Sequence, residues 1–206
     1  MKKIVSKKDI AHLDQRFRAN FINSIEGFKA LNLVGTIHSN GCTNLAPFNS
    51  IFHIGANPPL IGMVSRPDTV DRHTLENIRS TGQFTLNHVN ETIYRKAHQS
   101  AARYDTNVSE FKAVGLNEQF INGFSAPFVQ ESKLIMGLEL REIKTVELNG
   151  TYIIIGEIIH IEMATNKISE DGFVDIQQLG TITVAGLDAY YKTSLLERLP
   201  YAKPLM

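Results

Sequence analysis

Short runs of apolar and β-branched residues, separated by turn-forming residues, dominate the middle of the chain. Such runs occupy 31–37, 60–64 and 83–89, and Ser39-Asn40-Gly41 follows the first of them. Runs of this length bounded by Gly, Asn and Pro are typical of buried strands. They predict a hairpin turning at 39–41 and two further strands. Asn57-Pro58-Pro59 is expected to lead into the strand at 60–64 as an extended segment, because proline restricts the backbone.

Two longer strand patterns lie in the second half of the chain, at 133–141 and 151–163. Glu147-Leu148-Asn149-Gly150 lies between them, and Asn-Gly is a strong signal for a hairpin turn. We expect these two strands to complete a barrel.

Helical spacing is found in four places, at 9–23, 69–80, 91–104 and 109–115. In the segment 69–80, Leu75 and Ile78 are three residues apart, and Gly82 follows the expected end of the helix. Helices are therefore inserted among strands without regular strand–helix alternation, and no glycine-rich phosphate loop is present. The pattern predicts a mainly β fold with α additions, built as a partly closed barrel.

One domain is expected over residues 1–206, because no shift in composition marks a boundary. Its core should span about 28–163, after a helical lead-in at 1–27. The remaining segment, 164–206, is expected to lie beyond the strands that complete the barrel.

Composition narrows the class of protein. Apolar residues make up 43% of the chain, and 21 basic residues balance 21 acidic ones. We therefore expect no general attraction for nucleic acid or anionic lipid, so that any anion must be bound by a local cluster. The first nine residues lack the apolar stretch of a signal peptide and no later segment approaches bilayer-spanning length, which favours the cytoplasm. Cys42, the single cysteine, is interpreted as incidental.

The histidines lack the spacing that would place a pair on one face of an element, so no metal site is expected. The histidines considered are His12, His38, His53, His88, His98 and His160.

Three segments carry a resemblance to a known family. They are Asn44-Leu45-Ala46-Pro47-Phe48-Asn49, then Asn57-Pro58-Pro59-Leu60, then Arg72-His73-Thr74-Leu75-Glu76-Asn77-Ile78. In this order they resemble the flavin reductase family, over about 31–160. The resemblance implies an FMN-binding split β-barrel of Greek-key type that pairs as a homodimer. The chain departs from the family at Asn49, where Ser is frequent, and at Arg72-His73, where Lys-Asp is frequent.

Residues 44–50 offer many groups able to pair with the edge of a planar ring, and Phe48 could cover part of it. A turn with Phe48 as a core anchor is the alternative. Arg72, Thr74 and the start of a helix offer donors that suit a phosphate, and Ser65 and Arg66 could reach the same group. In the alternative interpretation the arginines are solvated and Thr74 only caps the helix. His98 is a further candidate, unless it is a surface helix residue. The candidate cofactor-binding residues are Asn44, Leu45, Ala46, Pro47, Phe48, Asn49, Ser50, Ser65, Arg66, Arg72, His73, Thr74, Asn77 and His98.

The resemblance implies an FMN-dependent oxidoreductase that passes a hydride from NADH or NADPH to bound FMN and then to free flavin or another acceptor. No catalytic residue is assigned, because the cofactor carries the chemistry. An electron carrier of the flavoredoxin type, without nicotinamide activity, is the alternative. Pyridoxamine-phosphate oxidation or haem handling fits the motifs less well. FAD in place of FMN, the choice of nicotinamide, and a monooxygenase or other redox partner stay open. Within the segment 164–206, which is expected to take part in the dimer, residues 174–180 and Tyr190-Tyr191 offer apolar and aromatic groups for the dimer interface. Packing of these residues within their own chain is the alternative.

Overall fold

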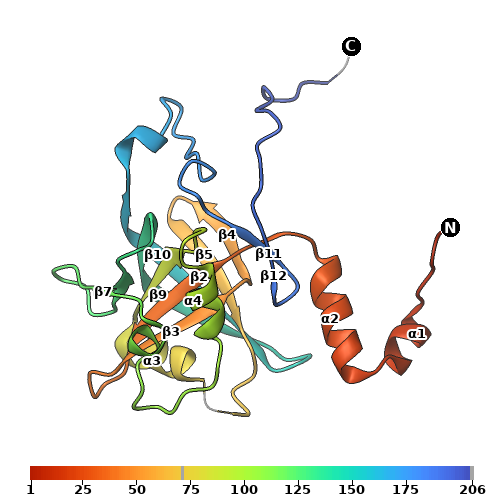
Figure 1. The fold of residues 1–206 in the computed structure, drawn as a ribbon, viewed down its shortest axis with the longest axis horizontal. Coiled ribbons are helices and arrows are strands. Elements are labelled where there is room, and N and C mark those ends of the chain that lie inside the picture. Colours follow the sequence, from red (N-terminus) through yellow and green to blue (C-terminus); the bar gives the residue numbers. More distant parts are fainter. Residues whose placement is uncertain (71, 205–206) are drawn as a thin grey trace.

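The computed structural model describes residues 1–70 and 72–204 (Figure 1). Asp71, which falls in the predicted helix 69–80, and residues 205–206 of the predicted C-terminal segment lie outside the described residues. No helix in the described part of the chain combines the length and apolar character needed to span a membrane.

A seven-stranded antiparallel sheet forms the centre of the fold, in the order β3-β2-β6-β9-β10-β5-β4. Its strands are β2 (Asn32–Ile37), β3 (Thr43–Phe48), β4 (Ile51–Ala56), β5 (Pro59–Ser65), β6 (Gln83–His88), β9 (Leu134–Val146) and β10 (Thr151–Met163). The two strands at the sheet's edges, β3 and β4, are consecutive in the chain. Only Asn49 and Ser50 separate them, so the two edges can be no more than about 11 Å apart at this link. The sheet must curl into a barrel that remains unpaired between β3 and β4.

Smaller elements surround this barrel (Figure 1). A three-stranded sheet has the order β1-β11-β12, and β7 pairs with β8. The small strands are β1 (Lys29–Ala30), β7 (Glu118–Gln119), β8 (Phe128–Val129), β11 (Thr183–Ala185) and β12 (Ala189–Tyr191). The helices are α1 (Lys7–His12), α2 (Gln15–Ile25), α3 (His73–Thr81), α4 (Tyr94–Gln99), α5 (Glu110–Val114) and the 3-10 helix η1 (Thr165–Lys167).

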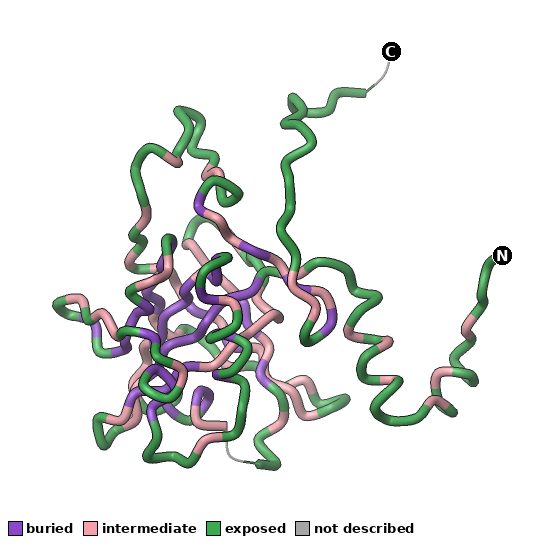
Figure 2. The backbone as a smooth tube through the Cα atoms, in the orientation of Figure 1, coloured by how far each residue is buried: buried purple, intermediate pink, exposed green. Residues whose placement is uncertain are grey.

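The apolar core lies on both sides of the sheet because successive strand residues face opposite ways. On β2, Leu33 belongs to a cluster shared with α4, α5 and β11, whereas Val34 belongs to a cluster inside the barrel. Leu75 and Ile78 of α3 pack into that second cluster, so α3 covers the barrel interior. Figure 2 shows buried backbone concentrated in the barrel, while the N-terminal helices and the C-terminal stretch are exposed.

The prediction of a mainly β fold with α additions is confirmed. The strands at 31–37, 60–64, 83–89 and 151–163 were predicted within a few residues, and the turn at 147–150 is present. The division into a single domain stays a prediction.

Several predicted elements were wrong in extent. The segment 9–23, whose spacing predicts a short helix followed by an approach segment, forms parts of two helices, because the Asp14 carboxylate accepts hydrogen bonds from the Arg16 and Phe17 amides and starts a new helix. The helix at 69–80 begins only at His73, and 91–104 contains helix only at 94–99. A turn anchored by the Asn90 side chain, which accepts from the Thr92 amide, delays that last helix.

Two strand predictions also need correction. Asn57 and Pro58 form a turn between β4 and β5, not an extended approach, and β4 was not predicted. Because β4 is an edge strand that is largely exposed, its sequence lacks a continuous apolar signal. Strand β9 continues to Val146, beyond the predicted end at Arg141, as a polar extension paired with β10.

Candidate functional site

A cavity of about 810 Å³ opens beside the link between the two sheet edges. Its walls come from β3, the Asn49-Ser50 link, the end of β5 and the start of α3. The segment 98–104 and the turn at 186–188 between β11 and β12 contribute further surface. The volume is in the range of small-molecule and cofactor sites. The split in the barrel therefore creates the main concave surface of the described chain.

The structure brings together most of the residues that the sequence suggested. Those that line the cavity are Asn44, Ala46, Pro47, Phe48, Asn49, Ser50, Ser65, Arg66, Arg72, His73, Thr74 and His98. Leu45 and Asn77 do not line it. The Leu45 side chain is fully buried in the core cluster shared with α4, α5 and β11. Asn77 is buried on the barrel-facing side of α3, where its amide donates to Thr36 Oγ1 at 3.0 Å.

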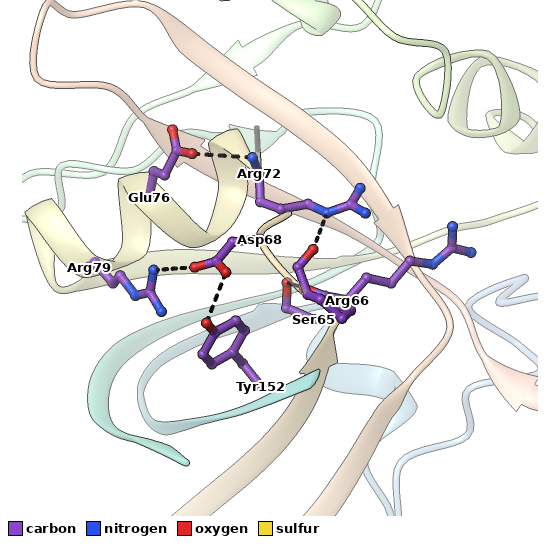
Figure 3. Close-up of polar contacts among 8 residues, drawn as sticks. Ser65, Arg66, Asp68, Arg72, Glu76, Arg79 and Tyr152 are labelled. Atoms are coloured by element: carbon purple, nitrogen blue, oxygen red, sulfur yellow. Dashed lines mark hydrogen bonds and ion pairs between the residues drawn. The ribbon is translucent and has the colours of Figure 1, made fainter. Parts of the chain in front are cut away.

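One end of the cavity is cationic. Arg66 follows β5, and Arg72 precedes α3; Figure 3 shows both guanidinium groups pointing in the same direction. Arg72 Nε donates to the Pro67 carbonyl at 3.1 Å, which fixes the side chain and leaves its terminal nitrogens for another acceptor. The start of α3 adds backbone N–H groups without helical partners. This end is suited to bind an anionic group.

The carboxylates near Arg66 and Arg72 form hydrogen bonds with groups other than the two guanidinium groups (Figure 3). Asp68 accepts from Arg79 at 3.1 Å and from the Tyr152 hydroxyl at 2.9 Å, contacts that lower the pKa of Asp68. Glu76 accepts from the Arg72 backbone amide at 3.2 Å. Within residues 1–70 and 72–204, neither Arg66 nor Arg72 forms an ion pair.

A buried polar network fixes Asn44 at the cavity wall. Its amide nitrogen donates to Thr36 Oγ1 at 3.2 Å and to Thr74 Oγ1 at 3.0 Å. Thr74 therefore links α3 to β3 and does not cap the helix; Arg72 is the N-cap residue and makes no side-chain cap. With both N–H groups of Asn44 used inside the protein, its carbonyl oxygen is the group left to meet a ligand.

Phe48 lines the cavity and also packs against the core cluster inside the barrel. Its position as a core residue is therefore established, and its contact with a planar ring stays a prediction.

The C-terminal segment contributes part of the wall. Asn49 donates through Nδ2 to the Gly186 carbonyl at 2.8 Å, which holds the β11–β12 turn at the cavity. His98 Nδ1 lies 2.7 Å from the Tyr190 hydroxyl, and burial raises the pKa of that tyrosine, with a smaller contribution from Asp188. His98 is thus both an exposed residue of α4 and a cavity residue. Tyr190 packs within its own chain, against the core cluster shared with α4, α5 and β11.

Glu110 is a buried charged residue of the cavity wall that the sequence did not indicate; Arg103 and Asp188 also line the cavity and were not among the candidates. Glu110 lies on α5, is 7% exposed, and its Oε2 accepts from the Leu45 amide at 3.0 Å. Burial raises the pKa of Glu110, while the Leu45 hydrogen bond and the charge of His73 act in the opposite direction. Its position in Ser109-Glu110-Phe111, at the start of a short helix, was the available signal.

Among the described residues, no group of three or more His, Cys, Asp or Glu side chains is placed to hold a metal ion. The cavity instead offers a cationic end and a wall of amide, hydroxyl and aromatic groups. Such a site can bind a planar molecule that carries an anionic group.

These features agree with comparison to known proteins. The family model of the flavin reductase like domain matches residues 29–179, so the chain belongs to this family and the resemblance seen in the sequence is confirmed. A candidate flavin reductase with a split barrel domain from Shewanella frigidimarina is 48% identical, with a TM-score of 0.94 over 98% of this chain and 100% of that one. The predicted split barrel is therefore confirmed.

More distant structures share the fold. Nitrilotriacetate monooxygenase component B from Bacillus cereus is 20% identical, with a TM-score of 0.84, and covers 97% of this chain and 100% of its own. Flavoredoxin of Desulfovibrio vulgaris is 22% identical, with a TM-score of 0.74 over 85% and 92% of the two chains. Membership of the family supports a redox function that involves flavin.

Proposed function

We propose that the protein is an FMN-dependent oxidoreductase of the NAD(P)H:flavin reductase type. The observation that carries the proposal is the cationic end of the cavity, where Arg66 and Arg72 meet the start of α3. Both arginines line the same cavity and have no ion-pair partner among the described residues, so their donors can bind an anionic ligand. A phosphate fits this arrangement.

The remaining wall fits the rest of FMN. Asn44 offers a carbonyl oxygen, and Asn49 and Ser50 lie at the link between the sheet edges. Phe48 adds an apolar surface, as flat rings require. The residues present therefore suit both ends of a flavin mononucleotide, although a dinucleotide such as FAD shares the same chemistry.

When bound, FMN would supply the redox chemistry, which is hydride transfer from a nicotinamide and delivery of the electrons to free flavin or another acceptor. The chain's own residues would bind and orient the cofactor. Arg66 and Arg72 would hold the phosphate, the Thr36–Asn44–Thr74 network would present a hydrogen-bond acceptor, and the β11–β12 turn would limit one side of the opening. No side chain is required to transfer a proton.

We further propose a cytoplasmic homodimer. Helix α2 contains no buried residue, and its Phe17, Ile22 and Ile25 are 55%, 42% and 63% exposed. The C-terminal stretch exposes Leu196 and Tyr201. Both segments extend away from the barrel (Figure 1), and exposed apolar surface of this kind is usually covered in an assembly. A monooxygenase component is a candidate acceptor of reduced flavin.

The test begins with the purified protein. The flavin it retains is released and identified, and NADH and NADPH oxidation is followed with and without added free FMN. Nicotinamide oxidation that depends on flavin supports the proposal. Stoichiometric FMN without nicotinamide oxidation would instead assign the protein as an electron carrier, and a protein that binds no flavin would refute both.

A second arm tests the phosphate end. Arg72→Ala should weaken FMN binding by about 10- to 150-fold, the effect of losing a hydrogen bond to a charged group worth about 1.5–3 kcal/mol. Arg95→Ala is the matched control, because Arg95 lies on α4 outside the cavity. Equal FMN affinity in the two folded variants would remove Arg72 from the site.

A further inference from the structure

A single carboxyl group, that of Glu110, is buried in the wall of a cavity whose other charged end is cationic. Glu110 is 7% exposed and borders the cavity. One of its oxygens accepts from the Leu45 amide at 3.0 Å, on the unpaired edge of β3. Within residues 1–70 and 72–204, no other residue donates a hydrogen bond to this carboxylate; its own backbone amide and the charge of His73 are its remaining favourable contacts.

The position of this carboxyl group is fixed by a second set of contacts. Ser109, which precedes it, lies 2.6 Å from Thr43 on β3 through the two hydroxyl oxygens. Thr43 also donates to Glu118 at 2.5 Å. These contacts tie the start of α5 to the edge of β3, so Glu110 cannot easily move away from the cavity when its charge becomes unfavourable.

Burial without an ion-pair partner makes a carboxylate costly, and such a group is rarely retained for stability alone. A neutral residue could accept the Leu45 hydrogen bond equally well. The charge is therefore the property that needs an explanation. The Glu110 charge would act electrostatically on a flavin bound in the cavity, since Asn44 and Ala46, on either side of Leu45, both line that cavity.

We propose that Glu110 sets the reduction potential of the bound flavin, an inference that rests on the proposed function. When a hydride moves from a reduced nicotinamide to a neutral flavin ring, both electrons and the hydrogen are transferred. The nicotinamide leaves as a cation, and the ring gains one negative charge. A fixed carboxylate at the wall repels that charge, favours the oxidised flavin and so lowers the midpoint potential. The reduced flavin is then a stronger electron donor and is bound less tightly.

The experiment compares midpoint potentials of the flavin-loaded protein, measured by equilibration with a reference dye. Glu110→Gln keeps the shape and an acceptor for Leu45 but removes the charge. We expect the preference for reduced over oxidised flavin to rise about tenfold, which raises the two-electron midpoint potential by about 30 mV. Glu147→Gln is the control, because Glu147 is an exposed carboxylate in the turn between β9 and β10 that does not line the cavity, and the potential of this variant should equal that of the wild type.

An unchanged potential in flavin-loaded Glu110→Gln would overturn the inference while leaving the proposed function intact. Failure of the wild type to bind any flavin would instead overturn the proposed function. If Glu110→Gln does not fold, Glu110→Asp retains the charge but withdraws it by one methylene group. Its midpoint potential should lie above that of the wild type, and a value equal to or below the wild type would contradict the proposal.

Discussion

His88 provides a test of the structure that does not depend on any ligand. It ends β6, and its ring nitrogen Nδ1 lies 3.2 Å from Thr181 Oγ1, in the segment that leads to β11. Burial lowers the pKa of His88 from its ordinary value of 6.5 to about 4. The unfolded chain therefore binds a proton between these two pH values while the folded chain does not.

The sign follows from that difference in bound protons. Stability is unaffected by His88 above about pH 6.5 and falls as the pH decreases toward 4, because protonation favours the unfolded state. At about 1.36 kcal/mol for each pH unit, the full loss is at most about 3.4 kcal/mol. The imidazole retains some exposed surface, so the measured value should lie somewhat below this limit.

The assay is urea unfolding at several values between pH 4.5 and 7.5. His88→Gln should lose less stability on acidification than the wild type, by about 2 kcal/mol at pH 4.5. His53→Gln, an exposed histidine on β4, is the control and should follow the wild type. If His88→Gln and the wild type show parallel curves of unfolding free energy against pH, the ring does not occupy the buried position described.

Three further outcomes are expected. Gly35→Ala should destabilise the fold by about 1–3 kcal/mol in urea unfolding, because its Cβ would overlap the Pro127 carbonyl and lie 2.5 Å from Thr85 Oγ1; an unchanged midpoint would contradict this packing. Without flavin, Glu110→Gln should be more stable than the wild type at neutral pH, since the raised pKa of Glu110 makes wild-type stability fall as the pH rises from 4.5 through that value. The advantage should vanish below pH 4.5, and its persistence there would assign it to another cause. Sedimentation at low micromolar concentration should show a dimer that FMN stabilises, whereas a monomer with full FMN stoichiometry would refute a shared site.

Strands buried on both faces could be predicted from the sequence because they carry clustered apolar and β-branched residues. Strand β2 is the clearest case: Leu33 and Val34 face opposite sides and both are fully buried. The edge strand β4 was missed for the converse reason, since its exposed Phe52 and Ile54 alternate with residues that carry no strand signal. Helix ends were misjudged where side chains decide them, as at Asp14.

The lining of the cavity could be predicted in part, because most of the candidates that line it lie in two continuous segments, 44–50 and 72–74, whereas Ser65, Arg66 and His98 lie elsewhere in the chain. A short link between edge strands and the start of a helix bring these segments together, and both features leave a local signature in the sequence. The cavity residues contributed by the C-terminal part of the chain leave no such local signature in the sequence. Asp188 and Tyr190 reach the cavity only because the Asn49 amide holds the Gly186 carbonyl, a contact across 137 positions of the chain.

Glu110 shows why the charge of a site is harder to infer than its shape. In the sequence it is an acidic residue in the first turn of a short helix, where a carboxylate is common and usually solvated. Its burial results from α5 packing against the edge of β3, and its hydrogen bond to Leu45 exists because that edge has no neighbouring strand. The same gap between β3 and β4 that opens the cavity therefore also leaves the backbone amide that draws a carboxylate into its wall. In this fold, the binding surface and the charge beside it follow from one unpaired strand edge.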